Sequence, residues 1–176
     1  MLTGSWASSL HGVPRSTHDI DLVVELSSGH IELLAKEFPA PEYYLSLTAM
    51  RDAVRLHDMF NLLHIPSGDK VDFWLLTDSG FDRSRFSRRE LAQLGNASLL
   101  IASAEDTILA KLSWAKKSGG SEKQFGDALQ VFQLLASLLD HEYLERWVEE
   151  LQLEELYQRL LNEAGEIDKG ATDVPF

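Results

Sequence analysis

Short apolar runs occur throughout the first hundred residues, and each has the length of a β-strand. The segment 19–26 is mostly apolar and rich in β-branched residues, and two carboxylates, Asp19 and Asp21, lie at its start. Similar runs over 43–47, 59–65, 70–76 and 99–102 predict further strands, the last of them at a sheet edge. The turn residues Pro66-Ser67-Gly68-Asp69 predict a hairpin between the runs 59–65 and 70–76.

Other segments space their apolar residues three or four positions apart, which predicts helices. A short helix is expected directly after Gly4, and Gly12 and Pro14 end it. Thr48 is expected to cap a helix that runs to about Val54, and Ser103 to cap one that Gly119-Gly120 ends. Further helices are expected over 30–38, from Ser121, and in the segment after Asp140.

This order of elements predicts an α/β (α+β) protein, with a mixed sheet flanked by helices and then a C-terminal helical segment. We expect the α/β core at 1–102, the helical segment packed on it at 103–165, and a tail at 166–176. The helices after Asp140 have apolar faces that fit packing on the preceding helices, and a partner-docking face is the alternative.

Composition limits the kinds of covalent link, metal site and cellular location that we expect for the protein. The chain has 176 residues and no cysteine, which excludes disulfides and thiolate metal sites and fits a reducing cytoplasm. We expect no signal peptide, because Met1-Leu2-Thr3 leads straight into Gly4, and no membrane association, because apolar runs stay short of the roughly 20 residues of a spanning helix.

The net charge of −12 makes the chain a poor non-specific binder of nucleic acid. Basic residues cluster only at Arg83, Arg85, Arg88 and Arg89. This cluster is either a solvated helix face or a clamp on phosphate, since guanidinium groups match phosphate oxygens.

The candidate chemistry lies in the first strand. Asp19 and Asp21 are two positions apart, so a strand places both on one face, where they repel unless a cation lies between them. Mg²⁺ binds oxygen ligands of this kind. The helix that follows Gly4-Ser5 begins with free N–H groups that can bind phosphate. Together these features indicate metal-assisted phosphoryl or nucleotidyl transfer.

Gly4-Ser5, thirteen further residues and Asp19-x-Asp21 resemble the nucleotidyltransferase superfamily that includes DNA polymerase beta. The surrounding stretch "HGVPRSTHDIDLVV", with Arg15 and Thr17 in it, is similar to the minimal prokaryotic branch, including AbiEii-type toxin nucleotidyltransferases. The later words "EDTILAKLSW" and "SEKQFGDAL" resemble the same branch, so the resemblance covers roughly residues 4–135.

The resemblance implies a nucleotidyltransferase fold and a set of site residues. Asp72 would be the third metal ligand, on a strand beside that of Asp19 and Asp21; an edge-strand acid facing water is the alternative. The three acids would hold two Mg²⁺ ions, with Mn²⁺ as a substitute. Implied nucleotide- and phosphate-binding residues are Gly4, Ser5, Arg15, Thr17, Lys111 and Asp127.

The implied activity is transfer of a nucleoside monophosphate from an NTP to an acceptor hydroxyl, and the similarity to AbiEii-type proteins adds a toxin–antitoxin role to this expectation. The acidic charge favours a protein or small-molecule acceptor, and relatives that act on tRNA keep RNA open. The alternatives are a non-catalytic interaction or antitoxin-type protein and a plain metal- or nucleotide-binding module.

Relatives have a helix and a strand before Gly-Ser, where this chain has three residues. We therefore expect unpaired sheet groups beside the Asp19–Asp21 strand, a loosely held Gly4-Ser5 turn, weak activity and a tendency to form a homodimer.

Overall fold

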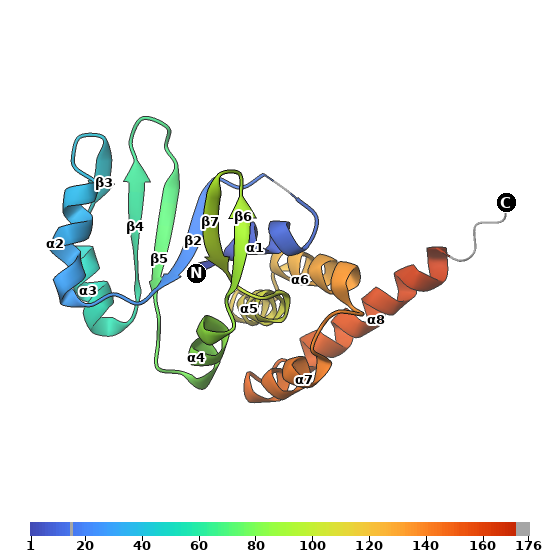
Figure 1. Cartoon of the computed structure of the whole chain (residues 1–176). Coiled ribbons are helices and arrows are strands. Elements are labelled where there is room, and N and C mark those ends of the chain that lie inside the picture. The colour runs from blue at the N-terminus through green and yellow to red at the C-terminus, as the bar shows by residue number, and fades with distance from the viewer. Residues whose placement is uncertain (15, 172–176) are drawn as a thin grey trace. The chain divides into compact units, whose positions relative to one another are not determined.

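The computed structural model describes residues 1–14 and 16–171, with side chains to residue 165, and confirms the α/β class (Figure 1). The chain divides into two compact units. The first unit comprises Met1–Trp6 and Ser16–Ala102, and the second comprises Ala7–Arg15 and the chain from Ser103 onward. Helix α1 (Gly4–His11) begins in the first unit and ends in the second.

The first unit is built on a mixed seven-stranded sheet in the order β3-β4-β5-β2-β1-β7-β6. Strands β2 and β5 are parallel, as are β1 and β7, and the other neighbours are antiparallel. The strand bounds are β1 (Leu2–Thr3), β2 (Asp19–Val24), β3 (Tyr43–Leu45), β4 (Met59–His64), β5 (Lys70–Leu75), β6 (Glu90–Leu94) and β7 (Ala97–Ile101). The hairpin expected around Gly68 joins β4 to β5.

The strand order corrects two expectations about the sheet, and the first correction comes from β1. Leu2 and Thr3 pair with Leu22 and Asp21 of β2, and Leu2 also pairs with Ile101 of β7, so part of β2 that was expected to be unpaired has a neighbour. The Met1 ammonium extends this pairing by donating to the carbonyl oxygen of Val23 at 2.9 Å, and burial, with the charge of Arg89, lowers its pKa. Strand β7 is not an edge strand either, because β6 lies outside it.

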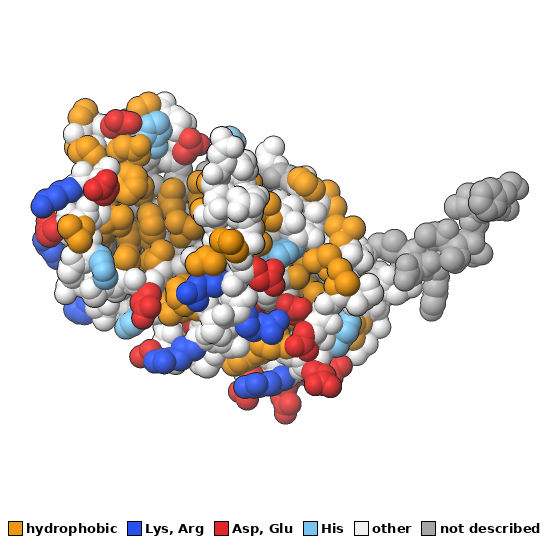
Figure 2. Space-filling model, viewed as in Figure 1, with side chains coloured by type: hydrophobic (Ala, Val, Ile, Leu, Met, Phe, Trp, Pro, Cys, Tyr) orange, Lys and Arg blue, Asp and Glu red, His pale blue; other side chains and the backbone are white. Residues whose placement is uncertain are grey.

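Helices α2 (Ser28–Glu37) and α3 (Leu47–Leu56) pack together and cover part of one sheet face (Figure 1). The core between these helices and the sheet is apolar. The rings of Phe60 and Phe73 stack there with their centroids 4.9 Å apart. Its buried residues are Ile31, Met50, Ala53, Phe60, Leu62, Phe73 and Leu75. Hydrophobic side chains are also visible at the surface over β4 and β5 in Figure 2.

Two local expectations in the first unit differ from the structure. Ser46, not Thr48, caps α3, because its side-chain oxygen is the one that accepts from the N–H of Ala49 at 3.2 Å. The arginine-rich segment is not one helix, since α4 (Gly80–Ser87) ends before Arg88 and the chain then enters β6.

The second unit is helical. It contains α5 (Ala104–Lys117), α6 (Glu122–Leu135), α7 (His141–Glu150) and α8 (Glu154–Ala171), and α5 packs against the other three. Ser103 caps α5 as expected, by accepting from the N–H of Asp106 at 3.2 Å. Part of the expected tail is helical, because α8 continues to Ala171; residues 172–176 lie outside the described part.

None of the described helices combines the length and the apolar character needed to cross a membrane.

The core position of α3 generates a test. Met50→Ala removes a fully buried side chain and leaves a cavity, so it should lower the free energy of unfolding of the first unit by about 2–5 kcal/mol. Leu56→Ala, near the end of the same helix and 59% exposed, should change it by about 0.5 kcal/mol or less. Urea unfolding followed by circular dichroism measures both; similar losses would contradict this placement of α3.

Candidate functional site

Strand register brings the predicted acids onto one face of the sheet. In the parallel pairing of β2 with β5, Asp21 lies opposite Asp72 and Asp19 lies opposite Lys70. Because side chains alternate along a strand, these four share a face, while Leu22 and Val24 point the other way and pack against the core under α2 and α3. Paired strands lie about 4.8 Å apart, so the Asp21 and Asp72 carboxylates leave the backbone as close neighbours.

The position of Asp72 fits the resemblance and not its alternative. Asp72 lies on an inner strand, between β2 and β4, and only 8% of the residue is exposed. An edge-strand acid facing water is therefore the wrong interpretation. A carboxylate buried to this extent needs a cation or hydrogen-bond donors.

Asp21 is held from two sides. Its Oδ1 accepts a hydrogen bond from the indole N–H of Trp74 at 3.3 Å. Its Oδ2 lies against Gly4, where an added Cβ would be 2.1 Å from that oxygen. Gly4 also has φ +63°, a conformation that L side chains rarely adopt. Glycine at this position therefore lets the start of α1 approach the acidic strand.

Lys70 supplies the positive charge of this face. Its Nζ lies 2.9 Å from Asp72 Oδ2 and 3.7 Å from Asp19 Oδ1. The hydrogen bond to Asp72 is the main cause that raises the pKa of the lysine. Asp19 remains 60% exposed at its side chain, so it is the outermost of the three acids. The ammonium thus neutralises part of a face that would otherwise carry three negative charges.

The other oxygen of Asp72 has no such partner. Asp72 Oδ1 is buried and makes no hydrogen bond within the described structure. Such an atom suits a divalent cation, with Asp21 as the neighbouring oxygen ligand. Across residues 1–14 and 16–165, however, no three His, Cys, Asp or Glu side chains converge as a metal-binding group. The residues fit a cation at Asp21 and Asp72. Asp19 is not a third ligand of this group, and the Lys70 ammonium contacts both Asp19 and Asp72.

The remaining predicted residues near the acidic strand are placed as follows. Ser5 is in the first turn of α1, next to Gly4. The Thr17 hydroxyl donates to the backbone oxygen of Asp19 at 3.3 Å, which shapes the entry to β2. Arg15 lies outside the described residues.

Lys111 and Asp127 belong to the second unit, where they bind each other. Lys111 Nζ, from α5, lies 2.7 Å from Asp127 Oδ2, from α6, and both side chains are less than 10% exposed. A buried ion pair depends on both partners, because removing one leaves an uncompensated charge. Sequence reasoning selected both residues by resemblance but did not predict that they would pair.

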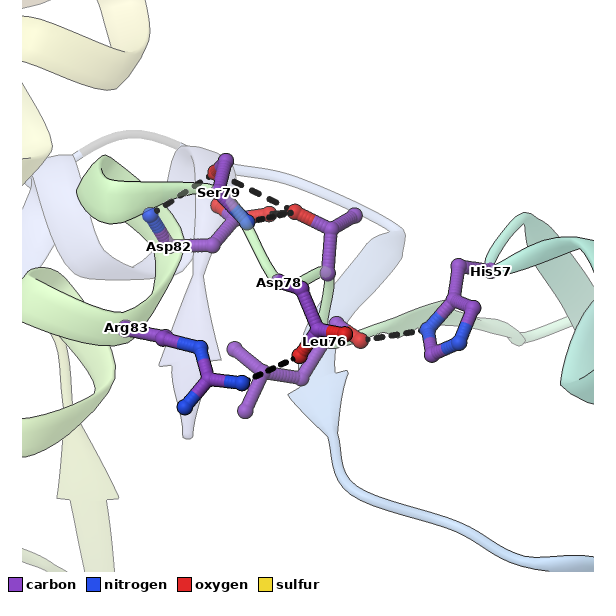
Figure 3. A network of polar contacts seen from close by, with 7 residues as sticks. His57, Leu76, Asp78, Ser79, Asp82 and Arg83 are labelled. Atoms are coloured by element: carbon purple, nitrogen blue, oxygen red, sulfur yellow. Dashed lines mark hydrogen bonds and ion pairs between the residues drawn. The ribbon is translucent and has the colours of Figure 1, made fainter.

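The arginine cluster is only in part a helix face in water, since the Arg83 side chain on α4 is 66% exposed and that of Arg85 is 17% exposed. The Arg83 guanidinium binds Asp78 at 2.6 Å, as Figure 3 shows, and Arg85 binds Asp82 at 2.7 Å. Arg89 stacks over the ring of Phe86 and donates to its backbone oxygen. All of these contacts lie within the segment between β5 and β6.

The same segment is fixed by capping groups (Figure 3). Ser79 caps α4 by accepting from the N–H of Asp82 at 3.1 Å, and the Thr77 hydroxyl donates to the Asp82 carboxylate. His57 Nδ1 meets the backbone oxygen of Leu76 at 2.8 Å and connects the end of α3 to the end of β5.

Sequence reasoning missed two residues of the acidic face, Lys70 and Trp74. Strand alternation could have found both, because they lie two positions before and after Asp72 on β5. Their contacts with Asp19 and Asp21 depend on the pairing of β2 with β5, which no local pattern specifies.

Gly4→Ala tests the contact with Asp21. The added methyl group should force the Asp21 carboxylate away and lower the melting temperature beyond the cost of a positive φ. Gly95→Ala is the matched control, since its φ is +59° and nothing lies within 4 Å of the added Cβ. Thermal unfolding followed by circular dichroism compares them; equal losses would show that Asp21 is not packed on Gly4.

Lys111→Met tests the buried pair. The variant leaves the Asp127 carboxylate buried without its cation, and it should lose about 3–5 kcal/mol of unfolding free energy. The double variant Lys111→Met/Asp127→Leu should recover most of that loss, because it removes both charges. A single variant as stable as wild type, measured by urea unfolding, would contradict a buried ion pair.

Comparison with known proteins leaves the family unassigned: no protein-family model matches this sequence, and no curated protein matches it either.

Proposed function

We propose that this protein is a metal-dependent nucleotidyltransferase that moves a nucleoside monophosphate from an NTP to an acceptor hydroxyl. The observation that carries the proposal is the register of Asp21 with Asp72, beside the start of α1 at Gly4. Two carboxylates and a glycine-initiated helix on adjoining elements suit a cation and a phosphate chain together. The sequence resemblance to minimal nucleotidyltransferases supports the same activity.

Within this proposal the cation ligands are Asp21 and Asp72, with Asp19 as the third acid. Mg²⁺, or Mn²⁺ in its place, would supply a Lewis acid that activates the acceptor hydroxyl and neutralises the triphosphate. Asp72 is also the candidate to accept the proton of that hydroxyl. Trp74 orients Asp21 through its indole N–H.

Phosphate binding would fall to Ser5 and the first N–H groups of α1, which follow Gly4. Arg15 and Thr17 belong to the same proposal through the resemblance. The resemblance also assigns nucleotide binding to Lys111 and Asp127, which belong to the second unit. In the structure the Lys111 ammonium is bound to Asp127, so Lys111 could bind phosphate only while keeping that contact.

The acceptor would be a hydroxyl on a protein or a small molecule, because a chain of net charge −12 binds nucleic acid poorly. A tRNA end remains a second class of acceptor. An NTP substrate implies a cytoplasmic protein, and a toxin–antitoxin partner would be consistent with the minimal branch.

Incubation with labelled NTPs, Mg²⁺ and a lysate containing RNA and protein tests the proposal. Wild-type protein should transfer label, and Asp21→Asn should reduce the transfer about a hundredfold or more. The metal-free variant should melt no lower than wild type, because the amide ends the repulsion with Asp72 and keeps an oxygen for the Trp74 N–H. Mg²⁺ with nucleotide should raise the melting temperature of wild type only.

Asp52→Asn is the matched control, because it makes the same chemical change on the exposed surface of α3 and should retain full transfer. NTP binding without label transfer would favour a plain nucleotide-binding module. A metal-free Asp21→Asn protein that melts lower than wild type would show that the carboxylate is structurally paired, against a metal site.

A further inference from the structure

The ammonium of Lys70 lies between two of the three acids that the proposed function assigns to metal binding. We propose that Lys70 is a built-in counter-ion that competes with divalent metal, so that the protein without nucleotide binds one divalent ion and not two. This inference rests on the proposed function, because it concerns the same carboxylates. It adds a residue that controls how many cations the acids accept.

The contacts of Lys70 show which oxygens it occupies. Its Nζ binds Asp72 Oδ2 at 2.9 Å, which leaves Oδ1 as the Asp72 oxygen without a hydrogen-bond partner. The same nitrogen lies 3.7 Å from Asp19 Oδ1. A cation bound by Asp72 Oδ1 and Asp21 is compatible with these contacts. A second cation that shared Asp19 with Asp72 would have to displace the ammonium.

The balance of charge gives the same result. The carboxylates of Asp19, Asp21 and Asp72 carry three negative charges, and Lys70 returns one positive charge. One divalent ion then makes the group neutral, and a second would leave it with two uncompensated positive charges. The negative charge of a triphosphate would offset that excess, so a second ion is expected to enter together with the nucleotide.

Lys70 also has a structural effect that distinguishes it from a lysine that merely covers the surface. Asp72 is 8% exposed, and a carboxylate buried to that extent without a cation is destabilising. Removing the ammonium should therefore lower the stability of the metal-free protein. The same removal should increase the stabilisation that metal provides, because the metal no longer competes with a bound cation.

Titration of the full chain with Mn²⁺ alone, followed by electron paramagnetic resonance of the free ion, tests the inference. Wild type should bind one ion weakly. Lys70→Met should bind Mn²⁺ about tenfold tighter or more, and should accept a second ion, because a nearby positive charge has been removed. Lys70→Gln should behave like Lys70→Met, and Lys70→Arg, which keeps the charge, like wild type. Lys36→Met removes an exposed lysine on α2 and should change nothing.

Melting temperatures give an independent readout. In chelator, Lys70→Met should melt below wild type, and Mn²⁺ should raise its melting temperature by more than that of wild type. Equal Mn²⁺ affinity and stoichiometry in wild type, Lys70→Met and Lys70→Gln would overturn the role of Lys70 and leave the proposed metal site in place. Failure of wild type and of both neutral variants to bind Mn²⁺ would overturn the metal site itself, and this inference with it.

Discussion

Electrostatic repulsion between Asp21 and Asp72 is the constraint on which the acidic face depends. The two residues are directly paired across parallel strands, so the backbone cannot move them apart without breaking the sheet. The surrounding residues reduce the cost instead. Trp74 donates to one carboxylate, and Lys70 binds the other. Gly4 allows the start of α1 to approach, with the N–H groups of its first turn.

The apolar core on the opposite face of the same strands offsets the destabilisation that the neighbouring carboxylates cause. Phe60, Phe73 and their neighbours pack against α2 and α3, and this apolar contact holds β4 and β5 in place. Side chains alternate along a strand, so a residue whose side chain packs in the core places the side chains of its two neighbours on the opposite face. Phe73 in the core thus fixes Asp72 on the acidic face.

The sequence alone was sufficient for features that depend on local patterns. It predicted the strand of Asp19 and Asp21, the hairpin around Gly68 and the Ser103 cap, because alternation, turn residues and capping groups act within a few positions. It failed for β1, because a two-residue strand is too short to have a pattern and is defined only by its two neighbours. For the arginine segment it left a solvated helix face and a phosphate clamp as alternatives, and it did not predict that Arg83 pairs with Asp78 and Arg85 with Asp82.

The pairing of β2 with β5 also determines when the acidic face forms during folding. Parallel strands cannot be joined by a tight turn, and here the chain builds α2, β3, α3 and β4 between them. Their contact has a long loop to close, and contacts of this kind form slowly compared with a hairpin such as β4–β5. Asp21 and Asp72 therefore become neighbours only in chains whose first unit is largely assembled. Chains in which β5 has not yet paired with β2 therefore lack the Asp21–Asp72 pair.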